Sequence, residues 1–410
     1  MSSEPVVIVG AGPGGLVCAI KLAQLGVSSI VLEKESFPRD KICGDALSGK
    51  VVNVMQKIMP DFVPTFSQQT TQIPCWGIHF FAPNQSSLRV PFKLSYNSQK
   101  DTPVGFIAKR IYFDHFLADY ARKHPNIQLI ENATVQKLNR TQTGIQISLA
   151  DGRTLQTNLV VGADGAQSQV AKQLAGFQID AKHFCAGLRV YYTGIQNLEQ
   201  DNFIELHFLN EVLPGYFWIF PLPNGEANVG LGMRSDVVQK QKINLKKLLQ
   251  QIITENPTFQ KRFQVAKALE PIRGFGLPMA SRRRVLSGDN FLLVGDAASL
   301  IDPFTGEGVG NAMISGYIAA EKTYAAIQQQ KFDSKFLKQY DKAVFQQLDS
   351  ELKVSTILQK LLNYPALFNF VVRKANNNPA LKETIICMFE NVDLRSKLKN
   401  PLFYLKLLFS

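Results

Sequence analysis

The strongest constraint on the fold is a glycine-rich turn near the start of the chain. Four apolar β-formers, residues 6–9, run directly into Gly10, Gly12 and Gly15, which stand at the spacing G-x-G-x-x-G. An amphipathic helical pattern follows, and a second apolar strand ends on Glu33. A strand, a glycine turn, a helix and an acid at the tip of the next strand, in this order, predict a dinucleotide-binding βαβ unit.

Each part of this motif has a physical role. Gly10 permits the tight turn, Gly12 lets a pyrophosphate approach the backbone, and Gly15 lets the helix pack close to the strand. The N-terminus of the helix offers N–H groups and the positive end of its dipole to phosphate oxygens. Glu33 is placed to accept hydrogen bonds from a ribose diol. We therefore expect this βαβ unit to hold the nucleotide.

Length and composition indicate a folded protein with two or three subdomains. The chain has 410 residues, of which 45% are hydrophobic and 19% charged, as in globular proteins. No basic region precedes the first strand, and no apolar run reaches about 18 residues, so we expect neither a secretory signal nor a spanning helix. Five scattered cysteines, never spaced C-x-x-C, favour a reducing cytoplasm and argue against a disulfide framework and against a zinc site, and we expect no metal.

The formal net charge of +12 has more than one interpretation. Solvated lysines on helix faces account for it, and so does attraction to anionic lipid, whereas a nucleic-acid role lacks a matching motif. Between Arg373 and Ser410, seven Lys and Arg residues stand against three Asp and Glu, and residues 402–409 are mostly leucine and aromatic. This basic segment can make a peripheral contact with a membrane or cap the core.

Two later segments repeat the pattern of a buried strand followed by glycine and an acid. Residues 159–162 lead to Asp164, and residues 292–295 lead to Asp296. A carboxylate at a strand end can bind a polyhydroxyl chain. The loop over residues 303–308 precedes a helix, where backbone N–H groups can hold negative charge on a ring system. We expect these segments and the glycine turn to converge on one ligand.

With these three segments, the chain resembles the FAD-dependent oxidoreductases of the p-hydroxybenzoate hydroxylase superfold, from its N-terminus to about Tyr324. The resemblance implies that the dinucleotide is FAD. It also implies an α/β protein with a Rossmann-like FAD-binding domain, an inserted antiparallel-sheet substrate domain and a helical C-terminal region. The implied boundaries are 1–75, 106–180 and 285–330 for the FAD-binding domain, 76–105 and 181–284 for the substrate domain, and 331–410 for the helical region.

The resemblance also implies which residues contact the cofactor. Arg110 is expected near the pyrophosphate or ribitol, although Lys109 adjoins it and a surface arginine before a helix is the other interpretation. The full implied set is Gly10, Gly12, Pro13, Gly14, Gly15, Glu33, Lys34, Cys43, Gly44, Arg110, Val135, Asp164, Gly165, Gly295, Asp296, Pro303, Gly306, Gly308 and Val309.

Two further segments resemble the geranylgeranyl reductase family, whose members reduce isolated double bonds of prenyl chains with reduced FAD. Residues 41–44 read K-x-C-G, and residues 214–221 read P-x-Y-x-W-x-F-P. The resemblance implies a reductase of geranylgeranyl-type double bonds in isoprenoid lipids or quinones, with hydride delivered from reduced flavin. NAD(P)H or a ferredoxin-like protein would act as transient electron donor. A cytoplasmic protein with peripheral contact at the inner face of the membrane would suit such a substrate.

Three residues of these segments are candidates for a role in the reaction. Alternate residues of a strand share a face, so Tyr216, Trp218 and Phe220 can form one aromatic wall for a prenyl chain or simply pack the insert. The phenol and the indole N–H can steer a polar head group. Cys43 precedes a helix expected over residues 45–55, which would lower the pKa of its thiol, with a buried structural cysteine as the alternative. The candidate catalytic residues are Tyr216, Trp218 and Cys43.

Two other functions stay open at this point. An FAD-dependent monooxygenase or halogenase would use the same cofactor to activate oxygen, although halogenases carry tryptophan where Tyr216 stands. A non-catalytic lipid-binding protein, similar to the escort proteins of prenylated GTPases, would use the fold without turnover. The intact glycines, together with Glu33, Asp164 and Asp296, favour retained FAD.

Overall fold

The computed structural model describes residues 5–93, 95–98 and 100–378, which divide into two compact units. Unit 1 contains residues 5–41, 110–183 and 277–352. Unit 2 contains the described residues of 42–109, 184–276 and 353–378. Each unit is therefore assembled from three separate segments of the chain.

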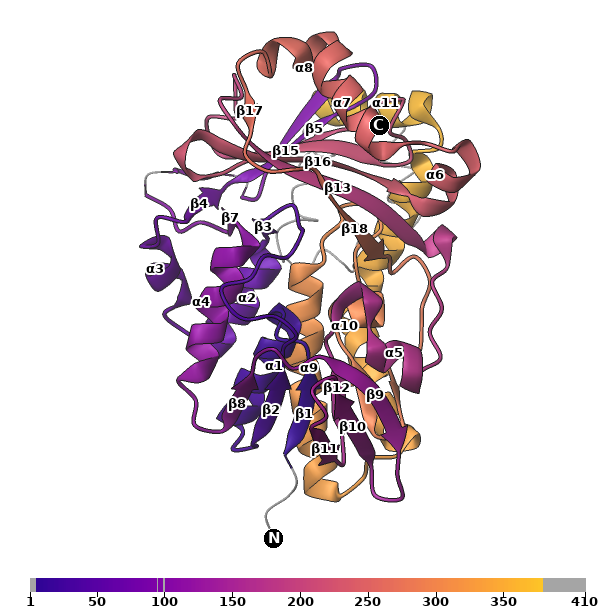
Figure 1. The fold of residues 1–410 in the computed structure, drawn as a ribbon. Coiled ribbons are helices and arrows are strands. Elements are labelled where there is room, and N and C mark those ends of the chain that lie inside the picture. Colours follow the sequence, from indigo (N-terminus) through magenta and orange to yellow (C-terminus); the bar gives the residue numbers. More distant parts are fainter. Residues whose placement is uncertain (1–4, 94, 99, 379–410) are drawn as a thin grey trace. The chain divides into compact units, whose positions relative to one another are not determined.

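A parallel sheet with the first strand at its centre organises unit 1 (Figure 1). Strand β1 lies between β12 and β2, and all four of its residues are buried. A continuous apolar run is what a strand covered on both faces requires. The sheet order is β19 (Ser287–Gly288), β20 (Phe291–Leu293), β12 (Val160–Gly162), β1 (Val6–Val9), β2 (Ser29–Leu32) and β8 (Ile127–Ile130), with only the β19–β20 pair antiparallel among the described strands.

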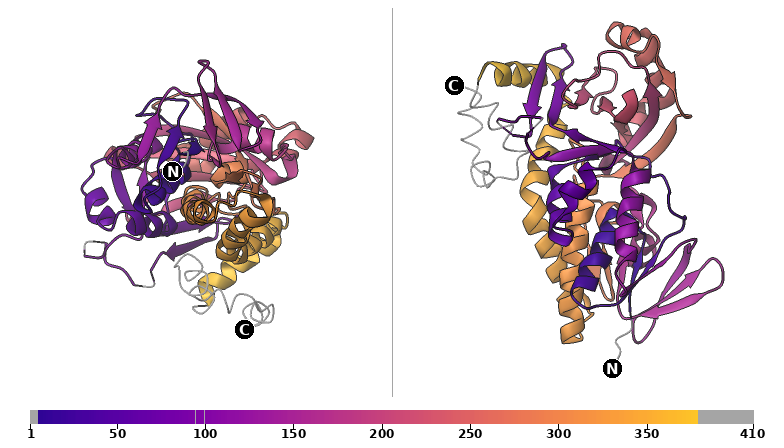
Figure 2. Two further views of the ribbon diagram at one scale, coloured as in Figure 1. Left: turned by 90° about the horizontal axis from the view of Figure 1, so that it is seen from below. Right: turned by 90° about the vertical axis from the view of Figure 1, so that its left-hand side faces the viewer.

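Helices and a small sheet cover the two faces of this parallel sheet. Figure 2 shows α9 (Val309–Gln329) and α10 (Ser334–Leu361) on one side and an antiparallel sheet on the other. That antiparallel sheet consists of β9 (Val135–Arg140), β10 (Ile145–Leu149) and β11 (Thr154–Thr157). The remaining helices of the unit are α1 (Pro13–Gln24), α4 (Arg110–Arg122) and α5 (Gln169–Leu174), with 3-10 turns at Gly165–Gln167, Ala181–His183 and Gly295–Ala298.

Helices α1 and α9 cross at unusually short range because both carry glycine at the crossing. A Cβ atom on Gly316 would lie 2.1 Å from the carbonyl oxygen of Gly14. A Cβ atom on Gly14 would lie 2.8 Å from the carbonyl oxygen of Ala312. The two helices therefore fix each other, and with them the start of α1.

A large, mostly antiparallel sheet forms unit 2. Strands β13 and β16 pair without a bulge over nine residues each, from Cys185 opposite Arg234 to Thr193 opposite Glu226. The strands in sheet order are β17 (Lys267–Ala268), β13 (Phe184–Thr193), β16 (Glu226–Arg234), β15 (Tyr216–Pro221), β14 (Ile204–His207), β5 (Gly77–Phe81) and β6 (Ser87–Pro91), and β18 (Arg273–Pro278) also pairs with β13.

The two faces of this sheet differ in what covers them. Phe217, Ile219, Val229 and Leu231 belong to one face and join a buried hydrophobic cluster. Helices α7 (Leu245–Glu255) and α8 (Pro257–Arg262) contribute Leu249, Ile252, Ile253 and Phe259 to that cluster. The alternate residues of β15 and β16 point to the opposite face. Helices α6 (Ser235–Gln241) and α11 (Pro365–Asn377), and a 3-10 turn at Pro223–Gly225, complete this part.

The segment between the K-x-C-G motif and β5 differs from the expected division. Residues 42–75, assigned from the sequence to the FAD-binding domain, fall in unit 2. There β3 (Ala46–Leu47) and β4 (Gln72–Cys75) pair with the two edges of β7 (Gly105–Ala108), and helices α2 (Gly49–Ile58) and α3 (Phe62–Ser67) lie between them in the chain. The expected helix from residue 45 is wrong at its start, because the strand β3 precedes it and α2 begins at Gly49.

No helix within residues 5–378, as far as the structure describes them, has both the length and the apolar content that crossing a membrane takes. The basic segment from Arg373 to Ser410 lies mostly outside the described residues.

Candidate functional site

The glycine turn between β1 and α1 has the geometry that its sequence predicts. Gly10 has φ +99°, and a Cβ atom there would lie 2.4 Å from the carbonyl oxygen of Ala163. Gly15 approaches Gly10 so closely that a Cβ atom would lie 2.1 Å from the Gly10 carbonyl oxygen. Gly12 is the N-cap of α1, and a Cβ atom on it would meet none of the described atoms within 4 Å. Gly10 and Gly15 are therefore needed for steric reasons, whereas Gly12 borders open space.

The acid at the tip of β2 turns back toward this glycine turn. Glu33 is buried, and its Oε2 accepts a hydrogen bond from the backbone N–H of Ala11 at 3.1 Å. Arg39, which the sequence analysis did not single out, donates to the carbonyl oxygen of Ala11 at 3.0 Å and to Glu33 Oε2 at 3.2 Å. The tip of β2 and the glycine turn are thereby joined by a carboxylate and a guanidinium.

Arg39 also links the turn to α4. Its Nη1 donates to Asp114 Oδ2 at 2.6 Å, and Arg110 donates to both oxygens of the same carboxylate. Burial alone would raise the pKa of Asp114, but the charges and hydrogen bonds of Arg110 and Arg39 hold that pKa below its usual range. Arg110 is thus buried and holds Asp114, while Lys109, in unit 2, pairs with Glu226.

Asp164, the acid after β12, caps the helix that follows it. Its Oδ2 accepts the N–H of Gln169 at 2.6 Å and that of Val170 at 3.3 Å, and its Oδ1 accepts the hydroxyl of Ser168. Burial raises the pKa of Asp164, and these hydrogen bonds oppose the rise. The carboxylate therefore fixes the start of α5, and the neighbouring Gly165 has φ +76° with no described atom within 4 Å of a Cβ position.

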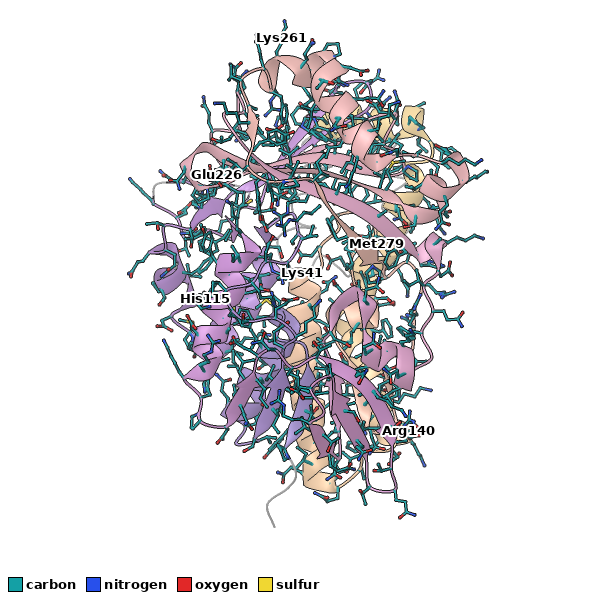
Figure 3. The ribbon with its side chains drawn as sticks, viewed as in Figure 1. Lys41, His115, Arg140, Glu226, Lys261 and Met279 are labelled. Atoms are coloured by element: carbon teal, nitrogen blue, oxygen red, sulfur yellow. The ribbon has the colours of Figure 1, made fainter. Side chains whose placement is uncertain are left out.

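Asp296, the acid after β20, lies beside a lysine of the loop that follows β2. Its Oδ2 is 3.5 Å from Nζ of Lys41, which is labelled in Figure 3, and both side chains are partly exposed. Gly295 has φ +59°, and a Cβ atom there would meet the methyl group of Ala312 at 2.7 Å. Because β1, β12 and β20 are parallel neighbours, their ends bring the glycine turn, Asp164 and Asp296 to one edge of the sheet.

The loop before α9 is ordered by two acids. Oδ1 of the buried Asp302 accepts the N–H groups of Phe304 and Thr305 at 2.9 and 2.8 Å. Glu307 accepts the N–H of Gly310 in the first turn of α9 at 2.7 Å. One N–H group at the start of α9 is therefore engaged within the protein. The rest of the loop contains Pro303, Gly306, which has φ +74°, and Gly308, which is the N-cap of α9. Val309 is the first residue of the helix.

Two remaining candidates lie near the tip of β2. Val135 is buried at the start of β9, two residues after Ala133, whose N–H donates to the carbonyl oxygen of Glu33. Lys34 is exposed and lies 3.9 Å from Glu35. All of the predicted cofactor contacts except Cys43 and Gly44 thus belong to unit 1.

The predicted aromatic wall forms a continuous row on β15. The ring centroids of Tyr216 and Trp218 are 6.1 Å apart, and those of Trp218 and Phe220 are 6.2 Å apart. The row lies on the face of the sheet opposite to the hydrophobic cluster that contains Phe217 and Ile219. The indole of Trp218 lies over Gly230, where a Cβ atom would be only 2.2 Å from the ring.

The polar end of this row is engaged inside unit 2. The indole N–H of Trp218 donates to Oδ1 of Asn228 at 2.8 Å, so it does not point to a ligand head group as the sequence analysis allowed. Gly44 lies flat against Phe220, because a Cβ atom there would be 2.9 Å from the ring. Cys43 is half-buried and six residues before α2, so the helix-terminus argument for an acidic thiol does not apply.

These residues fit FAD on the side of unit 1. No side chain of the described residues caps the start of α1, and Gly12 borders a space that a Cβ atom would enter without contact. Backbone N–H groups and a helix dipole at such a place suit a pyrophosphate. The described residues contain no group of three or more His, Cys, Asp or Glu side chains that could hold a metal ion.

A parallel sheet with a glycine turn after β1, and with an acid after each of β2, β12 and β20, defines a dinucleotide-binding protein. Residues 3–346 match the FAD binding domain family. The chain is 31% identical to the digeranylgeranylglycerophospholipid reductase of Methanocaldococcus jannaschii over 87% of both proteins. It is 30% identical to the reductase of the same name from Methanocella arvoryzae, over 88% of this chain and 89% of that one. The chain belongs to the geranylgeranyl reductase family of FAD-dependent oxidoreductases.

Solved structures share the fold. A geranylgeranyl bacteriochlorophyll reductase-like protein from Thermoplasma acidophilum superimposes with a TM-score of 0.77 and 22% identity, over 91% of each chain. A flavin-dependent brominase superimposes with a TM-score of 0.76 and 18% identity, over 98% of this chain and 99% of that one. At these identities the likeness concerns the fold, which reductases and halogenases have in common.

Proposed function

We propose that this protein reduces carbon–carbon double bonds of geranylgeranyl-type prenyl chains in an isoprenoid lipid. The observation that carries the proposal is the row of Tyr216, Trp218 and Phe220 on the face of the sheet opposite to the hydrophobic cluster. The curated relatives at about one-third identity, named for a digeranylgeranylglycerophospholipid, support a lipid of this class.

When bound and reduced, FAD would supply the hydride for the double bond. The protein's own part is to hold the cofactor and the chain of the substrate. In unit 1, the start of α1 would bind the pyrophosphate, Glu33 the ribose and Asp296 the ribitol, with Lys41 as an adjacent positive charge. Asp164 and Arg110 would act indirectly, because Asp164 accepts hydrogen bonds from the first turn of α5 and Arg110 donates to Asp114.

In unit 2, the aromatic row would line the prenyl chain. Trp218 offers a ring face, because its N–H already donates to Asn228. Aromatic faces exclude water from an apolar chain and attract the positive charge that develops when an alkene carbon gains a proton. Tyr216 is the half-buried member of the row and is the one placed to meet a more polar part of the substrate.

Electrons would come from NAD(P)H or a ferredoxin-like protein, and the enzyme would meet its lipid at the inner face of the membrane from the cytoplasm. The exposed apolar side chains of α11 and the turn before it support such a peripheral contact. Tyr364, Leu367 and Phe370 are 65, 47 and 41% exposed, and Arg373 follows them on the same helix. Apolar and basic side chains together suit an anionic lipid surface.

An anaerobic single-turnover experiment tests the proposal. The purified protein with its FAD reduced by dithionite is mixed with geranylgeranyl glycerophospholipids, quinones or pyrophosphates, and flavin absorbance and lipid mass are followed. We expect the flavin to reoxidise and the lipid to gain two hydrogen atoms per turnover. A flavin that stays reduced until oxygen enters, and then yields an oxygenated or halogenated product, would assign the protein to the monooxygenases or halogenases. A protein purified without flavin would favour lipid binding without turnover.

A further inference from the structure

A buried polar network in unit 2 joins the two segments that carry the reductase motifs. We call it the Asn228 network: Asn228 with Trp218, Cys43, Asp45 and Tyr191. Asp45 and Asn228 have no exposed surface, and Tyr191 and Trp218 are buried. The hydrophobic cluster of the unit lies on the other face of the same sheet. The network is therefore a separate feature from the core that stabilises the sheet.

Asn228 is at the centre of the network, and both the oxygen and the nitrogen of its side-chain amide make hydrogen bonds. Its Oδ1 accepts the indole N–H of Trp218 at 2.8 Å. Its Nδ2 donates to the carbonyl oxygen of Cys43 and to Oδ2 of Asp45, both at 2.7 Å. An indole nitrogen can only donate and a carbonyl oxygen can only accept, so the orientation of the amide is fixed by its partners.

The loop from Cys43 to Asp45 is held at further points. Tyr191 lies directly opposite Asn228 on β13 and donates its hydroxyl to the same Asp45 oxygen at 2.7 Å. Asp45 has φ +69°, a left-handed conformation that costs free energy for a residue with a side chain. Gly44 rests on the ring of Phe220. Such a conformation persists only where the surroundings determine it, and here the hydrogen bonds do so.

We propose that Asn228 is a positioning residue that keeps the Cys43–Asp45 loop and the Trp218 ring in a single arrangement. The effect that we expect Asn228 to have on turnover rests on the proposed prenyl reduction. Its effect on the loop is independent of that function. Without the amide, the Cys43 carbonyl and the Asp45 carboxylate would lose a buried donor, and the left-handed residue would lose a partner that holds it.

The main test uses Asn228→Asp, which keeps the shape and the acceptor for Trp218. The new oxygen would face the carbonyl of Cys43 and the carboxylate of Asp45 where Nδ2 now donates. We expect the Cys43 thiol to react with iodoacetamide roughly 10-fold faster, because two hydrogen bonds that resist local opening are lost. The rate is read from the mass of the peptide that contains Cys43, which separates it from the buried Cys18, Cys75 and Cys185.

The second readout is kinetic. In Asn228→Asp, the rate constant of prenyl reduction in single turnover should fall by about 10-fold or more, since a displaced loop and ring lose the productive geometry. FAD content and the rate of flavin reduction by dithionite should stay close to those of the wild type, because all of the predicted cofactor contacts except Cys43 and Gly44 belong to unit 1. A general loss of folding would lower all of these together.

A matched pair of tyrosine variants guards against misfolding of Asn228→Asp. Tyr191→Phe removes the hydroxyl that reaches Asp45, and we expect about threefold faster labelling of Cys43. Tyr192→Phe removes a hydroxyl from the next residue of β13, whose ring packs against Phe263 on the other face, and it should label as the wild type does.

Faster labelling in Asn228→Asp and Tyr191→Phe, but not in Tyr192→Phe, supports the proposal. Wild-type labelling rates in both network variants, with folded protein, would overturn it. If the wild type reduces no prenyl compound, the proposed function fails, and the labelling rates still decide whether Asn228 positions the loop.

Discussion

At the scale of single residues, Arg39 shows how a site residue escapes sequence reasoning. It lies in a loop without periodic pattern, and its partners are 6, 28 and 75 residues away in the chain. The glycine motif pointed directly to Gly10, Gly12, Gly15 and Glu33 because each has a fixed place in a local pattern. An arginine that connects an acid after one strand to an acid on a distant helix has no such local signal. Only the basic character of the loop around it was visible.

Replacing Arg39 with leucine should weaken FAD binding. The change removes the cation between Glu33 and Asp114, so both carboxylates lose a buried partner and the tip of β2 is no longer tied to the glycine turn. We expect the dissociation constant for FAD, measured by titrating the apoprotein, to rise by about 10-fold or more. Arg140→Leu, on the exposed side of β9 (Figure 3), is the control and should bind FAD as the wild type does.

Gly12→Ala should separate binding from stability. Gly12 has φ −74° and ψ 174°, which alanine adopts without strain, and beyond its two chain neighbours no described atom lies within 4 Å of its Cβ position. We expect the thermal midpoint of the apoprotein to stay the same or rise slightly, since alanine restricts the unfolded chain. FAD affinity should fall by about 10-fold or more, because the methyl group would occupy the space expected for the pyrophosphate. Unchanged FAD affinity would argue against this space as the phosphate site.

At the scale of helices and strands, the crossing of α1 and α9 sets the position of the glycine turn. Gly316→Ala would place a Cβ atom 2.1 Å from the carbonyl oxygen of Gly14 and force the helices apart. We expect a loss of stability of about 1–3 kcal/mol together with weaker FAD binding. Urea denaturation of the apoprotein and FAD titration would measure the two effects. A loss of stability with unchanged FAD binding would contradict this role of the crossing.

The strands of unit 2 show what periodicity predicts and where it stops. Alternation along β15 correctly placed Tyr216, Trp218 and Phe220 on one face. It could not reveal that Asn228 of β16 takes the indole N–H, because the register between two strands is not written in either strand alone. The helix expected from residue 45 was misplaced for a related reason. Strand β3 has only two residues and exists by pairing with β7, some 60 residues later, so it leaves no periodic signal.

At the scale of the whole molecule, acid should destabilise unit 2 through a buried cluster. Glu205 accepts two hydrogen bonds from Arg262, at 2.6 and 2.7 Å, and lies 2.8 Å from His207. Burial alone would raise the pKa of Glu205, but Arg262 and His207 lower it to about 2. Burial lowers the pKa of His207, with Glu205 opposing the change. Both groups therefore bind fewer protons in the folded than in the unfolded chain.

Stability should consequently fall as the pH falls. Below about pH 6.5, His207 takes up a proton more readily in the unfolded chain, which favours unfolding. The contribution of ionised Glu205 to the free energy of unfolding is complete above about pH 4.5 and is lost as the pH approaches 2. Glu205→Gln should cost roughly 3 kcal/mol at pH 7 and progressively less toward pH 3. Urea midpoints of both proteins at pH 7, 5 and 3 would measure this. A stability difference independent of pH would show that Glu205 does not titrate in this way.

Unit 1 is discontinuous, as the nucleotide-binding part of the expected division is, but the two divisions differ over residues 42–75 and 277–284 and over the expected helical region, which is split after residue 352. Discontinuity was visible because strands of the same buried type recur far apart, around residues 160 and 292. Residues 42–75 belong to unit 2 because β3 and β4 both pair with β7. Such long-range pairing cannot be predicted from the local sequence pattern.

The alternation of the two units along the chain also sets the order in which they can be completed during synthesis. The central sheet of unit 1 needs β20, and α1 needs its partner α9, so neither is whole until the ribosome has passed residue 316. At roughly 5–20 residues per second, the first strands wait on the order of 15–60 seconds for these partners. During that time the apolar β1 is present without one of the layers that bury it. Slow translation would therefore lengthen the time in which these apolar strands can pair wrongly.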